Sequence, residues 1–148
     1  MKSIILLLGL FLSTSSYGQC EISNLNQEER ILLETFWQEF RLSINRKDTL
    51  GLMNLCNYPI SCSYCKKTKD TPSPTISIIL LFLSPKFIEE INKHNLIENY
   101  FVVNENFNEK TKGCSYAFPF KKQNGQILYF KITQINGVYK INSTSTKR

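Results

Sequence analysis

The sequence predicts an α+β domain in which N-terminal helices pack on a curved, C-terminal antiparallel sheet, giving a cone-like shape. Three observations support this fold class. Apolar residues recur at three- and four-residue spacing from Leu33 to Ile44, as in an amphipathic helix. Asn136-Gly137 separates two β-patterned runs, which is typical of a hairpin. The roughly 130 residues that follow an export signal suit one domain.

Residues 1–18 have the features of a bacterial secretory signal peptide. Lys2 precedes an apolar run from Ile4 to Leu12, and small residues follow at Ser16 and Gly18. The run is shorter than the ~20 residues that span a bilayer. We expect cleavage after Gly18, a tether over residues 19–25, a single domain over residues 26–148, and no transmembrane segment in the mature chain. The mature protein would then be periplasmic or secreted.

Cys20 raises the alternative of an outer-membrane lipoprotein, in which a cysteine becomes the lipidated first residue. A lipidation signal has Leu and two small residues before the cysteine, whereas Tyr17, Gly18 and Gln19 precede Cys20. The bulky Gln19 argues against lipidation, and this alternative stays open.

Two N-terminal helices are predicted from their caps. Asn26 and Glu29 have the spacing of a capping box at the start of a helix of about five turns. Its buried stripe consists of Leu33, Phe36, Trp37, Phe40 and Ile44. Asp48 is placed to cap a short helix over Thr49–Cys56, and Pro59 then favours an extended turn over 57–60 towards the sheet.

The middle of the chain is predicted to return to helices after an exposed loop over 61–74, SCSYCKKTKDTPSP. The apolar run from Ile76 to Leu83 fits a buried strand or helix, and we favour a helix. Ser84-Pro85 is a typical helix start, and the apolar pattern continues to about His94.

The sheet is predicted from Tyr100–Val103, from 113–120 and from the hairpin over Gln126–Ile141, with a polar loop over Asn104–Lys112. Pro119 belongs at an edge or a bulge because it cannot donate to a ladder. A two-residue turn pairs Ile135 with Val138. The core face is then Leu128, Phe130, Ile132, Tyr139 and Ile141. The opposite face, which would suit a pocket wall or a dimer interface, carries Ile127, Tyr129, Lys131, Thr133, Ile135, Val138 and Lys140.

The five cysteines of an exported chain predict disulfides. We expect Cys20 to stay unpaired in the tether and Cys56, Cys62, Cys65 and Cys114 to form two bridges, for which three connectivities are open. A bridge from Cys62 or Cys65 to Cys114, with Cys56 taking the other, would staple the helices to the sheet. Its test is whether Cys114 lies close to any of these three.

Cys62-Ser63-Tyr64-Cys65 also has the spacing of a thiol-disulfide oxidoreductase, although it lies in a Lys- and Pro-rich loop rather than at the start of a helix. Zinc held by Cys56, Cys62, Cys65 and Cys114 would lack the second CxxC of a strong zinc signature. The prediction is therefore no metal and no cofactor.

Catalytic motifs are scarce in this sequence. His94 is the only histidine and falls at a helix end, Asp48 is a cap and Asp70 is a loop residue. The Asn142-Ser143-Thr144 sequon is discounted because the signal is bacterial. The net charge of +6 is diffuse, with basic residues in predicted loops and ends, and indicates a solvated surface. An acidic partner such as an anionic lipid surface or glycan is the alternative, and nucleic acid is not expected.

The order of a long helix with FWQEFRLSINRKD, a short helix with LGLMNLCNYPI, a further helix and a closing LYFKITQINGVYKI resembles the nuclear transport factor two-like superfamily. The resemblance implies helices in the curve of a bent sheet and a cavity that binds ligands or performs catalysis in some members. No catalytic residue carries over. The expected function is noncatalytic binding of a small apolar ligand or a protein partner, with an enzyme of the same fold as an alternative.

Overall fold

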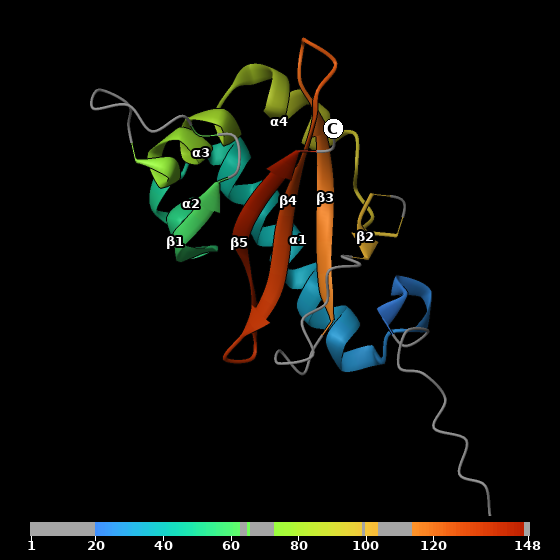
Figure 1. The fold of residues 1–148 in the computed structure, drawn as a ribbon. Coiled ribbons are helices and arrows are strands. Elements are labelled where there is room, and N and C mark those ends of the chain that lie inside the picture. Colours follow the sequence, from blue (N-terminus) through green and yellow to red (C-terminus); the bar gives the residue numbers. More distant parts are fainter. Residues whose placement is uncertain (1–19, 63–64, 66–72, 99, 104–113, 147–148) are drawn as a thin grey trace, which may run out of the picture.

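The computed structural model describes residues 20–62, 65, 73–98, 100–103 and 114–146, and its helices and strands form the predicted α+β domain (Figure 1). The helical elements are η2 (Ile22–Asn24), α1 (Gln27–Arg46), α2 (Thr49–Asn54), α3 (Pro74–Phe82) and α4 (Pro85–Asn92). The strands are β1 (Cys56–Cys62), β2 (Val102–Val103), β3 (Ser115–Lys121), β4 (Ile127–Ile135) and β5 (Val138–Thr146).

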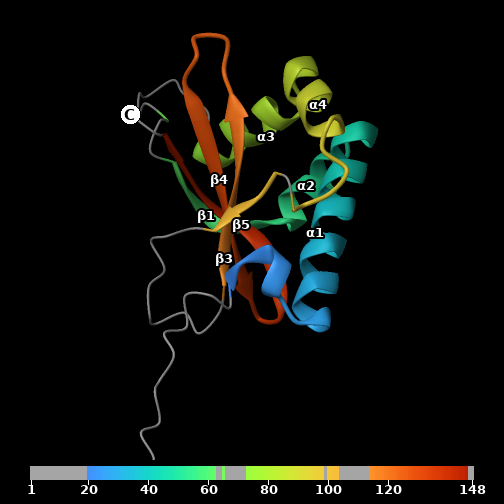
Figure 2. The same cartoon turned by 90° about the vertical axis from the view of Figure 1, so that its right-hand side faces the viewer.

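The strands form one curved sheet in the order β1-β5-β4-β3-β2. Figure 2 shows α1 to α4 on one side of the sheet, so each strand has one face towards helices and one face away from them. The pairs β2–β3, β3–β4 and β4–β5 are antiparallel, as predicted. The first strand differs, since β1 pairs in parallel with β5 from Cys56 opposite Ile141 to Cys62 opposite Thr144.

The expectation of a turn over 57–60 after a helix ending at Cys56 is therefore wrong. The α2 helix ends at Asn54 and residues 56–62 add a strand to the sheet. Periodicity could not reveal this strand because Pro59 lies inside it and its exposed residues are not in alternation. The strand tolerates Pro59 because its register with β5 is irregular between Cys56 and Ser61, and because β1 is at the edge of the sheet.

The predicted helix starts are confirmed. The Glu29 backbone N–H donates to Asn26 Oδ1 over 2.8 Å, and the Asn26 side-chain amide donates back to Glu29 Oε2. Asp48 accepts from the Gly51 N–H over 2.9 Å at the start of α2. Ser84 caps α4, with Pro85 at its first position. Each cap satisfies a backbone N–H that the first helical turn leaves without a partner.

The predicted hairpin and its register are also confirmed. Asn136 and Gly137 have φ values of +50° and +82°, as a type I′ turn requires, and Ile135 pairs with Val138. The hairpin is longer than predicted because β5 continues to Thr146. A bulge lies between the pairs Lys131–Ser143 and Ile132–Ile141, which reverses the alternation and turns Thr144 towards the core.

Among the described residues, no strand pairs with Pro119 on the side of β3 that faces away from β4. The two-residue β2 pairs only with Tyr116 and Ala117, and Tyr129 of β4 lies opposite Pro119 on the inner side. The hydroxyl of Tyr100 donates to the Pro119 carbonyl instead of a strand N–H. The predicted edge position of Pro119 is thus confirmed.

Aromatic rings fill the space between the helices and the sheet. Phe118 and Phe130 stack with centroids 5.1 Å apart, and Phe82 and Phe87 of the helices pack on Phe130 and Phe120 at 5.1 and 4.7 Å. The four residues predicted for the core, Trp37, Phe40, Phe130 and Ile132, are at most 1% exposed. Burial of rings of this size is the main stabilising contribution to such a core.

Some predictions fall outside the described residues. These are the signal peptide over 1–18, the polar loop over Asn104–Lys112, Asp70, and most of the loop over 61–74. In the part of the chain that is described, none of the helices is both long and apolar enough to cross a membrane.

Candidate functional site

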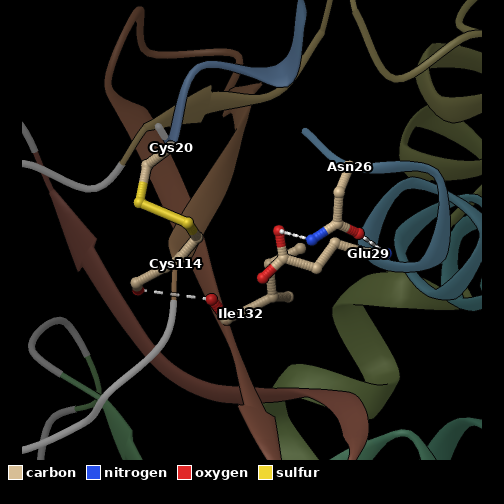
Figure 3. The surroundings of a disulfide bond; sticks show 6 residues. Cys20, Asn26, Glu29, Cys114 and Ile132 are labelled. Atoms are coloured by element: carbon tan, nitrogen blue, oxygen red, sulfur yellow. Dashed lines mark hydrogen bonds between the residues drawn. A yellow bond between two sulfur atoms is a disulfide. The ribbon is translucent and has the colours of Figure 1, made fainter. Parts of the chain in front are cut away.

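The cysteines pair differently from the prediction. Cys20 bonds to Cys114, with Cα atoms 5.4 Å apart, and Cys62 bonds to Cys65, with Cα atoms 5.5 Å apart. Figure 3 shows the first bridge joining the N-terminal segment to the chain just before β3, beside the capping box of Asn26 and Glu29. The expected staple from Cys62 or Cys65 to Cys114, the pairing of Cys56 and the unpaired Cys20 are all wrong.

The physical reason is the path of residues 20–25, which do not form a free tether. Ile22 is only 8% exposed and belongs to the core, and Cys20 and Leu25 are partly buried against that core. Anchored at Ile22 and at the Asn26 cap, this segment brings Cys20 to the start of β3. The bridge therefore staples the segment before α1 to the sheet.

Cys56 carries the remaining thiol and is 2% exposed at the start of β1. Burial raises its pKa to about 12, although the Lys140 ammonium acts in the opposite direction. A buried thiol with so high a pKa is a poor nucleophile at neutral pH because it holds almost no thiolate. Cys56 is a core residue.

A groove of about 320 Å³ lies between α1 and the beginning of β5. Its lining is Leu32, Thr35, Phe36 and Glu39 of α1, Asn54 and Leu55 at the end of α2, and Val138, Tyr139 and Lys140 of β5. Five of these side chains are apolar or aromatic, and Thr35, Glu39, Asn54 and Lys140 supply polar atoms. An apolar lining with a few polar groups is typical of a small-ligand site, and this volume lies at the lower end of the usual range.

The groove exists because β1 begins to pair with β5 only at Ile141, three residues after β5 begins. The first hydrogen bond from β5 towards the α2–β1 junction runs from the Ile141 N–H to the Leu55 carbonyl over 2.9 Å. Cys56 opposite Ile141 is the first register pair, so β1 does not extend alongside Val138–Lys140. The side of this three-residue stretch that faces away from β4 is turned towards α1 and lines the groove.

Tyr139, which lines the groove, packs against a second buried tyrosine. Tyr116 of β3 and Tyr139 of β5 have centroids 6.0 Å apart, and the exposed fraction of each is 3% or less. Each hydroxyl interacts with the other, and neither bonds to a further described group. Burial, helped by the nearby Glu29 carboxylate, raises the pKa of Tyr139 to about 12, and burial, helped by the neighbouring Tyr139 and Glu29, raises the pKa of Tyr116 as well. Both stay protonated at neutral pH.

His94 lies away from the groove and has a packing role. Its ring stacks on Tyr100 with centroids 3.8 Å apart, and its carbonyl accepts from Trp37 Nε1 over 3.0 Å. Its Nε2 faces Glu90 Oε1 at 3.5 Å. Neither His94 nor Glu90 lines the groove, so the only histidine of the sequence lies outside this candidate site.

The four cysteines considered above as an alternative zinc site are not available together. Cys62, Cys65 and Cys114 are committed to disulfides, and the described residues contain no group of three His, Cys, Asp or Glu side chains that could hold a metal ion. Sequence reasoning placed Val138 and Lys140 on a face that would suit a pocket wall, but it did not predict their groove with α1. The late start of β1 depends on a strand that the sequence did not reveal.

Comparisons with models of known protein families, with curated proteins and with solved structures found no match.

Proposed function

We propose that this chain is an exported, noncatalytic binding domain of the nuclear transport factor two-like kind, and that it holds a small apolar ligand in the groove between α1 and β5. The observation that carries the proposal is the apolar groove itself, which opens where β1 stops short of Val138–Lys140. Helices packed against one face of a bent sheet support the resemblance.

The lining sets the chemical class of the ligand. Leu32, Phe36 and Leu55 offer apolar contact, while Lys140 and Glu39 lie at the polar part of the lining. A small molecule with an apolar body and one polar end fits this arrangement. The space between helices and sheet is filled by rings such as Phe82 and Phe130, so the ligand enters at the end of the sheet rather than its centre.

Binding rather than catalysis is favoured by the titratable groups near the groove. Tyr139, with its raised pKa of about 12, is a poor base, and His94 is stacked on Tyr100 elsewhere. The alternative of a thiol-disulfide oxidoreductase is less well supported. Cys62 is the last residue of strand β1, whereas the attacking cysteine of such enzymes begins a helix that lowers its pKa.

The Cys20–Cys114 bridge supports a mature chain without a lipid anchor. A sulfur bonded to Cys114 cannot also carry a thioether-linked lipid, so the bridge and lipidation exclude each other. Intact mass of the protein from the bacterial envelope tests this point. A chain beginning at Gln19 with no added acyl mass is expected, and a diacylated chain beginning at Cys20 would contradict it.

The groove is tested with 1-anilinonaphthalene-8-sulfonate, a fluorescent probe with an apolar ring system and one anionic sulfonate, and a matched pair of valine variants. Val138 in the groove is 48% exposed and Val102 on β2 is 44% exposed, so aspartate at either position adds the same charge at similar exposure. Val138→Asp should weaken probe binding at least about fivefold because a carboxylate resists desolvation. Val102→Asp should leave it unchanged.

Equal loss in both variants, or none in Val138→Asp, would show that the probe binds elsewhere and would remove the groove as the ligand site. A bulky substitution at the exposed Thr35, Thr35→Trp, supplies a second test that leaves charge unchanged. It should fill the groove and block the probe. Circular dichroism of each variant checks that the fold is intact.

A further inference from the structure

The charge of the chain is unevenly divided along its sequence. The sequence holds 18 basic and 12 acidic residues, yet the last 35 positions, 114–148, hold six basic residues and no acidic one. The preceding 113 residues are therefore balanced at 12 of each sign. The whole excess of +6 belongs to these last 35 positions: Lys121, Lys131 and Lys140 lie on β3, β4 and β5, Lys122 follows β3, and Lys147 and Arg148 fall outside the described residues. The expectation of a diffuse excess confined to loops and ends is incomplete.

Three of these lysines lie on the outer face, which we define as the face of β3, β4 and β5 turned away from the helices. Lys140 lies beside the part of β5 that β1 leaves uncovered, so it borders both the outer face and the groove. Strand alternation and register place these residues there: Lys121, Pro119 and Ala117 of β3; Ile127, Tyr129, Lys131 and Thr133 of β4; Lys140, Ser143 and Ser145 of β5. Their inward neighbours Leu128, Phe130 and Ile132 are fully buried. Figure 2 shows the described helices on the opposite side of the sheet.

The lysines form a diagonal across the outer face with one aromatic ring between them. Lys121 lies opposite Ile127, Lys131 is opposite Ser143, and Lys140 is opposite Thr133. Tyr129 lies on β4 between the levels of Lys121 and Lys131. With strands ~4.8 Å apart and residues ~3.3 Å apart, the Cα atoms of Lys131 and Lys140 are ~8 Å apart, and those of Lys121 and Lys131 ~14 Å.

We propose that this outer face binds an acidic polysaccharide. The lysines would pair with its carboxylate or sulfate groups, and charge of one sign over a surface attracts a partner of the opposite sign. Ser143, Ser145 and Thr133 offer hydroxyls that donate to and accept from sugar hydroxyls. Tyr129 presents the amphipathic ring on which a sugar can stack.

The composition of the face favours a glycan over a lipid surface. A membrane-binding face combines lysines with a cluster of apolar side chains that enter the acyl region. Here Ile127 lies at one end of the hairpin and Ile135 and Val138 at the other, with polar residues between them. Among the described residues, the ion pairs of the acidic side chains are made with Arg30, Lys93 and His94 of the helical half, and none is made with Lys121 or Lys131.

The test measures binding of the full mature chain to immobilised polygalacturonate by interferometry. Lys121→Gln combined with Lys131→Gln avoids the groove residue Lys140. It should lower the affinity about fivefold or more, since each exposed charge pair contributes a few-fold. The matched control is Arg46→Gln combined with Lys86→Gln, which removes the same charge from exposed positions in the helical layer. It should change the affinity less than twofold.

Two further measurements separate charge from stacking. Binding should weaken as sodium chloride rises from 50 to 500 mM, because salt screens exposed charges, and the salt dependence should be shallower in the Lys121→Gln/Lys131→Gln variant. Tyr129→Ala should lower the affinity with the salt dependence unchanged, whereas Tyr58→Ala, a 46% exposed tyrosine of β1, should have no effect.

Several outcomes would overturn the proposal. Equal losses of affinity in the two double variants would show that binding depends on the net charge of the chain and not on the outer face. Tighter binding to phosphatidylglycerol vesicles or to a 20-nucleotide thymidine strand than to polygalacturonate would assign the face to another class of partner. Sedimentation showing a dimer that Lys131→Glu dissociates would make the outer face an interface between two copies of the chain.

Discussion

At the scale of single residues, the structure separates the cysteines by environment rather than by spacing. Cys62 and Cys65 bond locally and Cys20 reaches Cys114 across the chain. Cys56 is left as the one free thiol among the five cysteines. Its side chain sits beside Ile141 in the β1–β5 pairing, where neither solvent nor another sulfur is available. The thiol is therefore protected by packing.

Alkaline pH should destabilise the fold through Cys56. Its pKa rises from 9.0 to about 12 on folding, so the folded state holds this proton more tightly than the unfolded state. The stabilisation is complete below pH 9 and is lost as pH rises towards 12, with a slope approaching about 1.4 kcal/mol per pH unit. Urea unfolding at pH 8 to 10 measures that slope.

Cys56→Ala is the control for this effect. It should be less stable at neutral pH, because a buried side chain is truncated, but flatter in its pH dependence between 9 and 10. Above pH 10, Tyr139 and Tyr116, whose pKa values are also raised by burial, add to the loss in both proteins. An identical slope in the two proteins between pH 9 and 10 would assign the alkaline loss to the tyrosines alone.

At the scale of helices and strands, the sequence predicted the features that depend only on residues close together in the chain. The caps at Asn26, Asp48 and Ser84 and the turn at Asn136-Gly137 each depend on residues within four positions of one another. The β1 strand and the bulge on β5 depend on partners far along the chain, so the sequence could not show them. The groove between α1 and β5 is a product of these long-range pairings.

Gly137 should tolerate substitution only by residues that accept a positive φ. At φ +82° a Cβ meets no steric obstacle within 4 Å, so the cost of a side chain is conformational. Gly137→Asn should cost little, Gly137→Ala about 1 kcal/mol, and Gly137→Val more, because β-branching disfavours this region most. Urea unfolding of the three variants gives the order. Equal losses for asparagine and valine would contradict the type I′ turn.

At the scale of the whole molecule, the chain is organised as a helical layer on a sheet whose strands β3, β4 and β5 carry basic residues and no acidic ones. The aromatic core holds these layers together, and the segment at Cys20–Leu25 is tied to the sheet by Ile22 and by the bridge to Cys114. The order of the helices and of the closing strands was predictable from periodicity, caps and turns, but β1 was not. The bridge was not, because residues 20–25 carry only a short apolar signal and their path is set by the start of β3.

The long bridge should stabilise the fold far more than the short one. Cys20 and Cys114 are 94 residues apart, and Cys62 and Cys65 are three apart. In the chain-entropy model, closing a loop of that length removes about 4 to 5 kcal/mol of unfolded-state entropy, whereas a three-residue loop removes much less. Urea unfolding should therefore place Cys20→Ala/Cys114→Ala well below Cys62→Ala/Cys65→Ala in stability.

The two bridges should also differ in which segments of the chain they protect from local opening. Loss of the Cys20–Cys114 bond frees the segment that holds Ile22, so hydrogen exchange should rise at the start of α1 and of β3 while α3 and α4 stay protected. Loss of the Cys62–Cys65 bond should affect only the end of β1. Equal stability of the two double variants, or exchange that rises uniformly over the chain, would show that the N-terminal segment is not held to the sheet by Cys20.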